Sequence, residues 1–440
     1  LTQKHKINTL PEQLIVKNEY NELGQLISKN VGGNDTTGTS GYQKVDYTYN
    51  VRGWLKSIND IENIVYENDL FAFGINYNDP EEGTPLYNGN ISETQWMTNS
   101  DGVLRRYEYT YDALNRLLNA EYTKPYTAST PLNNYKEELT YDKNGNILTL
   151  LRNGDRDSDG AVGELEIDDL FYTYHNTKKN QLMKVFDSSG VSVGFNDDTD
   201  GTIGSDSNDD YNYDGNGNMI QDENKGITNI IYNHLNLPIY IEFVETAKSI
   251  SYLYNANGQK INKTINSGAP LYTITNTEYM HGGFQYKGSD LQFFPLSEGY
   301  VYISDNRGVN SFNYVYNYTD HLGNIRLSYG MDPATASLKI IEENHYYPFG
   351  LKHTNYNSDL LLYQKESTGG IVLKGPGPTA PPEPSYKYKY NGKEYQDELG
   401  LNFYDYGARN YDPAIGRWMN IDPLAEKYID FSPYNYVMNN

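Results

Sequence analysis

Apolar and polar residues alternate along most of the chain in short runs, and Gly, Asn, Asp and Pro separate these runs. Alternation with a period of two predicts β-strands that bury one face, and the separating residues predict tight turns. Segments with the periodicity of an amphipathic helix are almost absent. The pattern therefore predicts an all-β protein made of short strands.

A seven-residue unit recurs within this pattern. It begins with Tyr, continues with Asp or Asn, two variable residues, Gly or Asn and one further residue, and ends with an aliphatic or bulky residue. Asp or Asn caps a turn and Gly or Asn adopts positive φ, so each unit predicts a β-hairpin. A lone hairpin is only marginally stable, so the units must stack into a continuous, winding sheet. The copies are Tyr20–Leu26, Tyr49–Leu55, Tyr111–Leu117, Tyr141–Ile147, Tyr213–Met219, Tyr232–Pro238, Tyr254–Lys260 and, with one inserted residue, Tyr318–Arg326.

A proline-rich segment divides the chain. Gly375–Ser385 contains repeated Pro, which cannot donate to a strand ladder, so it predicts a linker or a surface crossing. We therefore expect a repeat region over residues 1–330, a connecting segment over 331–385 and a terminal module over 386–440.

The terminal module holds the densest candidate chemistry. Within Tyr404–Pro423, two Asp-Pro steps bracket a Gly-Arg-Trp turn, which places Asp412 and Asp422 at strand ends with Arg417 between them. Two carboxylates held in this way can form an acid–base pair. The structural alternative is that both Asp side chains accept turn amides and that Arg417 is their salt-bridge partner.

An acidic insertion matches the spacing of a calcium-binding loop. Oxygen ligands at alternate positions surround one ion, and a Gly at the sixth position allows the sharp turn. The flanking segments predict strands rather than paired helices, so the alternative is a solvated acidic hairpin tip. The candidate Ca²⁺ ligands are Asp155, Asp157, Asp159, Ala161 through its carbonyl, and Glu166.

Composition excludes several classes of protein. The net charge of −23 argues against nucleic-acid binding, which needs a surplus of Lys and Arg. Cysteine is absent, so there is no disulfide framework or thiolate site. No apolar run approaches the roughly 18 residues of a membrane span. The abundance of Tyr, 45 residues, suits strands with one packed face. Neither end of the chain carries a natural signal, so we expect a fragment of a longer protein.

The repeated unit resembles the YD repeats of the RHS family. The terminal run resembles the RHS repeat-associated core domain, in the form common in Bacteroidetes-type sequences. The matching segments are Asp320–Asn324, Tyr347–Gly350, Asn391–Glu394, Tyr411–Pro413, Gly416–Trp418, Asp422–Pro423 and Tyr434–Asn440.

This resemblance implies a hollow β-spiral cage closed by the core domain as a plug, as in polymorphic toxins, the Tc-toxin C component and teneurins. It implies that the shell encapsulates and delivers a C-terminal effector toxin, with an immunity protein as a further partner, and that the protein is secreted or surface-displayed on a bacterium. It also implies that the core is a self-cleaving aspartyl peptidase using Asp412 and Asp422, with Arg417 as their charge partner. The family's cleavage step follows the Tyr-x-Tyr-x-x-Asn-Asn run, with which this chain ends.

The sequence is also compatible with a different function. Tyr-rich faces stack on sugars and calcium loops are typical of extracellular adhesins, so the chain could instead be a surface module that recognises a glycan or a neighbouring cell. The sequence predicts no other catalytic site, because His321 has no Ser, Cys or second His near it in the sequence and suits a turn.

Overall fold

Nearly all regular structure in the protein is antiparallel β-sheet. The computed structural model describes residues 1–126, 134–154, 165–198, 209–270, 272–305, 310–353, 360–365, 370–375 and 386–440. A first sheet of 13 strands runs in chain order. Its strands are β1 (Thr2–His5), β2 (Gln13–Tyr20), β3 (Leu26–Val31), β4 (Gln43–Tyr49), β5 (Leu55–Ile58), β6 (Phe71–Asn76), β7 (Glu93–Thr98), β8 (Arg105–Tyr111), β9 (Leu117–Thr123), β10 (Glu137–Tyr141), β11 (Ile147–Gly154), β12 (Leu165–Tyr174) and β13 (Leu182–Asp187).

A second sheet of 13 strands continues in chain order, and two smaller sheets follow. The second sheet contains β14 (Tyr211–Tyr213), β15 (Met219–Asp222), β16 (Ile227–Tyr232), β17 (Pro238–Phe243), β18 (Lys248–Tyr254), β19 (Lys260–Ser267), β20 (Ile274–Tyr279), β21 (Gln285–Lys287), β22 (Asp290–Leu296), β23 (Gly299–Asp305), β24 (Asn310–Thr319), β25 (Ile325–Asp332) and β26 (Ser337–Glu343). The smaller sheets are β27 (Leu362–Lys365) with β28 (Ile371–Lys374), and β29 (Glu394–Gln396), β30 (Phe403–Asp405), β31 (Asn410–Asp412) and β32 (Arg417–Trp418).

The helices of the described residues are short 3-10 turns. They are η1 (His281–Gly283), η2 (Tyr390–Gly392), η3 (Glu398–Gly400), η4 (Ala425–Lys427) and η5 (Val437–Asn439). Across the described ranges, no helix has the length and apolar character needed to span a bilayer.

Each repeated unit forms the hairpin that its sequence predicts. In the unit that begins at Tyr49, the backbone N–H groups of Arg52 and Trp54 donate to Asn50 Oδ1 at 2.9 and 3.0 Å. Gly53 has φ of +80°, a conformation that Gly adopts without strain. The strand register shifts between Thr48 and Tyr49, so each such hairpin closes on a β-bulge. The Asp or Asn at the second position therefore organises the turn.

A tyrosine at the end of a strand fastens one hairpin to an earlier one in four of the repeated units, and Tyr174 does the same outside them. The hydroxyl of this Tyr donates to a backbone carbonyl on a neighbouring strand, where the tyrosine ring packs against the sheet. This bond satisfies a polar group that packing would otherwise bury alone. The bonds run from Tyr49 to Leu26 O at 2.8 Å, Tyr111 to Ile91 O at 2.9 Å, Tyr141 to Leu117 O at 2.7 Å, Tyr174 to Ile147 O at 2.7 Å and Tyr232 to Met219 O at 2.5 Å.

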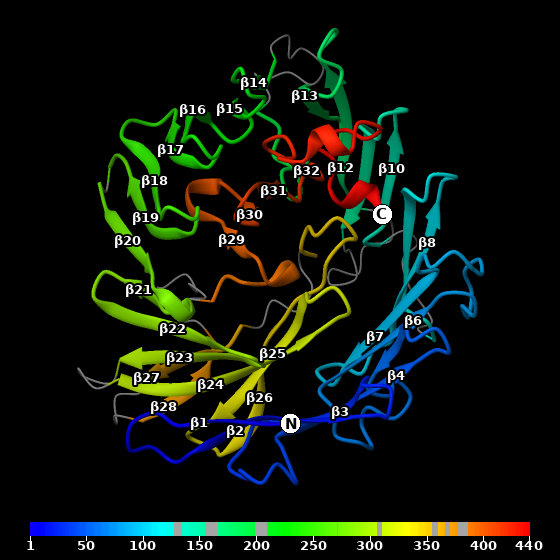
Figure 1. Ribbon diagram of the computed structural model, residues 1–440, viewed down its shortest axis with the longest axis vertical. Coiled ribbons are helices and arrows are strands. Elements are labelled where there is room, and N and C mark those ends of the chain that lie inside the picture. The colour runs from blue at the N-terminus through cyan, green and yellow to red at the C-terminus, as the bar shows by residue number, and fades with distance from the viewer. Residues whose placement is uncertain are drawn as a thin grey trace.

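The two large sheets curve into an open ring around the terminal module (Figure 1). Each sheet forms about half of the wall, and the ends of the wall meet where the Tyr316 hydroxyl donates to Leu14 O and Lys29 pairs with Glu298 at 2.6 Å. No strand pairing between the two sheets occurs among the described residues, so side-chain contacts join the ends of the wall and the strand ladder itself is unclosed. The prediction of an all-β fold that winds into a partial cage is confirmed, with two sheets in place of one continuous sheet.

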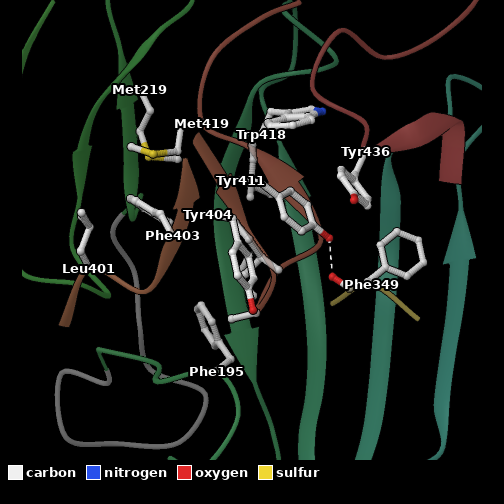
Figure 2. Packing of buried hydrophobic residues seen from close by; sticks show 14 of the residues in the cluster. Phe195, Met219, Phe349, Leu401, Phe403, Tyr404, Tyr411, Trp418, Met419 and Tyr436 are labelled. Atoms are coloured by element: carbon white, nitrogen blue, oxygen red, sulfur yellow. Dashed lines mark hydrogen bonds between the residues drawn. The ribbon is translucent and has the colours of Figure 1, made fainter. Parts of the chain in front are cut away.

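An apolar interface joins the terminal module to the concave side of the wall. Tyr404, Tyr411, Trp418 and Tyr436 lie among the packed side chains shown in Figure 2, and each is less than a tenth exposed. They belong to one buried cluster with wall residues of β9 to β18, including Leu150. Burial of this cluster stabilises the module's position inside the ring.

Candidate functional site

Asp412 lies at the end of β31, directly opposite Arg417 in the ladder with β32. The Asp412 side chain is buried, and its Oδ1 accepts the backbone N–H of Ala414 at 2.9 Å. Its Oδ2 pairs with Nζ of Lys225 at 3.1 Å, and the backbone N–H of Lys225 donates to Asp222 Oδ1 at 3.2 Å. The wall therefore supplies the cationic partner of Asp412, and the module's own turn supplies its amide partner.

Asp222 is a buried carboxyl that the sequence did not single out. Burial raises its pKa to about 7, an effect that Lys225 opposes and Asp412 increases. The buried carboxyl groups of Asp222 and Asp412 thus both interact with the ammonium group of Lys225. Because burial disfavours the charged form of a carboxyl group, Asp222 can hold a proton near neutral pH.

The raised pKa of Asp222 predicts how its stability contribution varies with pH. The folded pKa lies above the unfolded value of 3.8, so the contribution is full below that value and is lost as the pH rises through about 7. Asp222→Asn should therefore be more stable than the wild type above pH 7, by up to about 4 kcal/mol, and should lose this advantage in acid. Urea unfolding of both proteins across this pH range measures the difference.

Asp430→Asn provides the control, because Asp430 is exposed in the same chain. Its effect should stay within about 0.5 kcal/mol at every pH. A difference between Asp222→Asn and the wild type that is the same in acid and in base would contradict the prediction.

Arg417 contacts the wall rather than a carboxylate. Its guanidinium donates to the Tyr174 hydroxyl at 2.8 Å and to Asn180 O at 2.9 Å. It also lies over the rings of Tyr174 and Tyr434, with centroids 5.0 and 5.5 Å away. The side chain is buried, so this arrangement fixes the end of β32 against the β12–β13 turn.

Asp422 is the most accessible of the three predicted residues, with 30% of its side chain exposed. Its Oδ1 accepts the N–H of Leu424 at 2.7 Å, and its Oδ2 pairs with Arg409 at 3.0 Å. Asp412 and Asp422 thus both accept turn amides, as the structural alternative expects, but their cationic partners are Lys225 and Arg409. The described ion pairs do not join Asp412, Asp422 and Arg417 into one cluster.

A buried ionic network connects the wall to the turn between β31 and β32. Arg152 is fully buried and pairs with Glu137 at 2.7 Å and with Asp168 at 3.2 Å. It also donates to the carbonyls of Pro413 and Ala414 at 2.9 and 2.6 Å. These contacts hold the residues that follow Asp412 in place.

Side chains of the terminal module bind the turns of five successive hairpins, from β8–β9 to β16–β17. In every case the acceptor is a backbone carbonyl of the turn. The bonds are Asn440 to Asn115 O at 2.7 Å, Asn439 to Gly145 O at 2.8 Å, Arg417 to Asn180 O at 2.9 Å, Tyr434 to Gly217 O at 2.7 Å and Asn420 to Asn236 O at 3.2 Å. The module is therefore attached along one edge of the wall at regular intervals.

Most of the predicted calcium loop lies outside the described residues. This applies to Asp155, Asp157, Asp159 and Ala161. Glu166 lies on β12 opposite Asn153. The described ranges contain no group of three or more His, Asp or Glu side chains that suits a metal ion. Calcium binding by this loop stays a prediction, which titration calorimetry with Ca²⁺ can test.

The fold defines an open all-β shell that holds a C-terminal module on its concave side. No protein-family model matches the chain. Solved structures of TcdB2–TccC3 have a similar fold, with a TM-score of 0.55 and 16% identity over 98% of this chain and 20% of theirs. One of these, with the same values, lacks its hypervariable C-terminal region. A Photorhabdus luminescens Tc holotoxin pore has a TM-score of 0.50 and 15% identity, over 98% of this chain and 21% of that chain.

Part of the chain is also similar in sequence to a curated protein. Salivary gland surface protein 1 of Aedes aegypti is 27% identical in an alignment of 240 residues that covers 52% of this chain. The chain spans about a fifth of the Tc-toxin structures and 6% of the mosquito protein. The TM-score of 0.55 shows that the chain shares its fold with the TcdB2–TccC3 structures.

Proposed function

We propose that the chain forms the wall and plug of an RHS-type shell, which encapsulates and delivers an effector carried on the same polypeptide. The main support is the attachment of the terminal module to five successive wall turns on the concave side. A peptide that continues from the module would start inside the ring. The fold shared with TcdB2–TccC3 supports the same function. Secretion or surface display, and an immunity protein as partner, are parts of this proposal.

Protection of a cargo tests the proposal. An unfolded, protease-sensitive reporter joined after Asn440 should be cut at least about tenfold more slowly than the same reporter joined before Leu1, because enclosed backbone must be exposed before a protease can cut it. Limited proteolysis followed by mass spectrometry measures both rates. Equal rates for the two fusions, with the wall itself intact, would exclude an enclosing role.

We further propose that the terminal module cleaves its own polypeptide and that Asp422 is the acting carboxyl group. Its partial exposure and its one ion pair among the described residues, with Arg409, support this choice. Asp412 and Arg417 are then positioning residues, since both are buried in contacts with the wall. Substitution of Asp422 tests the proposed self-cleavage.

A further inference from the structure

A cavity of about 460 Å³ lies between the wall and the terminal module. Phe195 and Lys225 line it from the wall, and Tyr346, Lys352, Lys389 and Tyr404 line it from later segments. Figure 2 shows Phe195 and Tyr404 next to each other at this place. Its size is in the range of cavities that bind small ligands or a few residues of peptide.

The cavity carries positive charge although the whole chain carries −23. Lys389 and Lys352 both pair with Glu342, so two ammonium groups share one carboxylate. The Lys352 Nζ lies 3.5 Å from Glu342 Oε1. Lys352 keeps 48% of its side chain exposed, so a ligand can reach it. Among the described residues, this part of the lining therefore has one positive charge more than negative charge.

The other two lysines of the lining are each neutralised. Lys225 pairs with Asp412 at 3.1 Å, and Lys387 pairs with Asp397 at 2.5 Å. The described lining of the cavity thus has a surplus of one positive charge, which Lys352 and Lys389 share. A ligand with one negative charge would balance it, whereas a dianion would exceed it.

Asn344 supplies an independent indication of a ligand. It is fully buried and lines the cavity. Neither its Nδ2 nor its Oδ1 forms a hydrogen bond within the described part of the chain. A buried amide without partners costs free energy, and a ligand oxygen would satisfy its N–H group.

We propose that this cavity binds a carboxylate on an apolar peptide segment, with Lys352 and Lys389 pairing with the carboxylate and Asn344 donating to it. Apolar and aromatic side chains, among them Phe195, Tyr346 and Tyr404, also line the cavity, which suits the flanking side chains of such a segment. The inference does not depend on encapsulation, because the charge and the amide are present in the chain itself. The carboxylate can belong to an acidic side chain or to a peptide C-terminus.

Calorimetry with three short probes tests the site on the 440-residue chain. The probes are N-acetyl-Tyr-Glu-Tyr-amide, N-acetyl-Tyr-Gln-Tyr-amide and N-acetyl-Tyr-Gln-Tyr with a free C-terminus. The neutral amide should bind at least about tenfold more weakly than one of the two carboxylate probes, because charged hydrogen bonds are stronger than neutral ones. The better of the two carboxylate probes identifies the source of the carboxylate.

Lys352→Gln should weaken the better probe by at least about tenfold, and Asn344→Leu by about threefold or more. The double variant Lys387→Gln with Asp397→Asn is the matched control within the same cavity, because it removes an ion pair and leaves the net charge of the lining unchanged, and its effect should stay below about threefold. Thermal unfolding confirms that each variant is folded. Equal binding of charged and neutral probes, no binding of any probe, unchanged affinity in Lys352→Gln, or tighter binding of inorganic phosphate would each overturn the proposal.

Discussion

Arg152→Met is expected to destabilise the protein by about 3–5 kcal/mol, because it removes the cation from a buried network and leaves two carboxylates without their partner. Glu137 and Asp168 are fully buried with Arg152. The substitution also removes the bonds from Arg152 to Pro413 O and Ala414 O, which attach the β31–β32 turn to the wall. Urea unfolding measures the free energy, and hydrogen exchange over residues 404–423 measures the loosening of the turn.

Arg52→Met is the matched control. Arg52 is exposed and contacts the Trp54 ring and Tyr87 O, so its removal should cost less than about 1 kcal/mol. Adding Glu137→Gln and Asp168→Asn to Arg152→Met should recover part of the loss, since the buried charges are then gone. A loss below about 1 kcal/mol for Arg152→Met alone would show that the network contributes little.

The hairpins could be predicted because their signal is local. In Asp142–Asn146, the Asp accepts the turn amides of Asn144 and Asn146, and Gly145 adopts positive φ, all within five residues. The tyrosine bonds could not be assigned, because the carbonyl that Tyr141 contacts belongs to Leu117 on another strand. Their acceptors depend on how the hairpins stack, which the spacing of the repeats does not specify.

Only part of the candidate site could be predicted from the sequence, for the same reason. The turn contacts of Asp412 and Asp422 follow from their Asp-Pro steps. The cations that pair with them, Lys225 and Arg409, could not be predicted, because charge pairing across the fold leaves no periodic pattern in the sequence. Arg152 is similar: an Arg within a strand normally suggests a solvent-facing side chain, and only the tertiary structure reveals its burial.

Asp422→Asn should slow self-cleavage by roughly 10²–10⁴-fold, if the terminal module cleaves a peptide bond that follows it in the same polypeptide. The carboxyl group is partly exposed, and its Oδ2 contacts only Arg409 among the described side chains. Asn keeps the size of the side chain and can still accept the Leu424 N–H, but it cannot transfer a proton. Gel mobility of the extended polypeptide against time measures the rate.

Stability separates a catalytic effect from a structural one. Asp422 and Arg409 both reach solvent, so their ion pair should contribute about 1 kcal/mol or less, and Asp422→Asn should unfold at nearly the same urea concentration as the wild type. Asp412→Asn removes a buried partner of Lys225, so it should lower stability by more than Asp422→Asn does. Asp430→Asn, an exposed change in the same segment, should cleave at the wild-type rate. If Asp422→Asn also cleaves at that rate, Asp422 is not the acting carboxyl group. If the extended wild type stays intact, the module acts only as a plug.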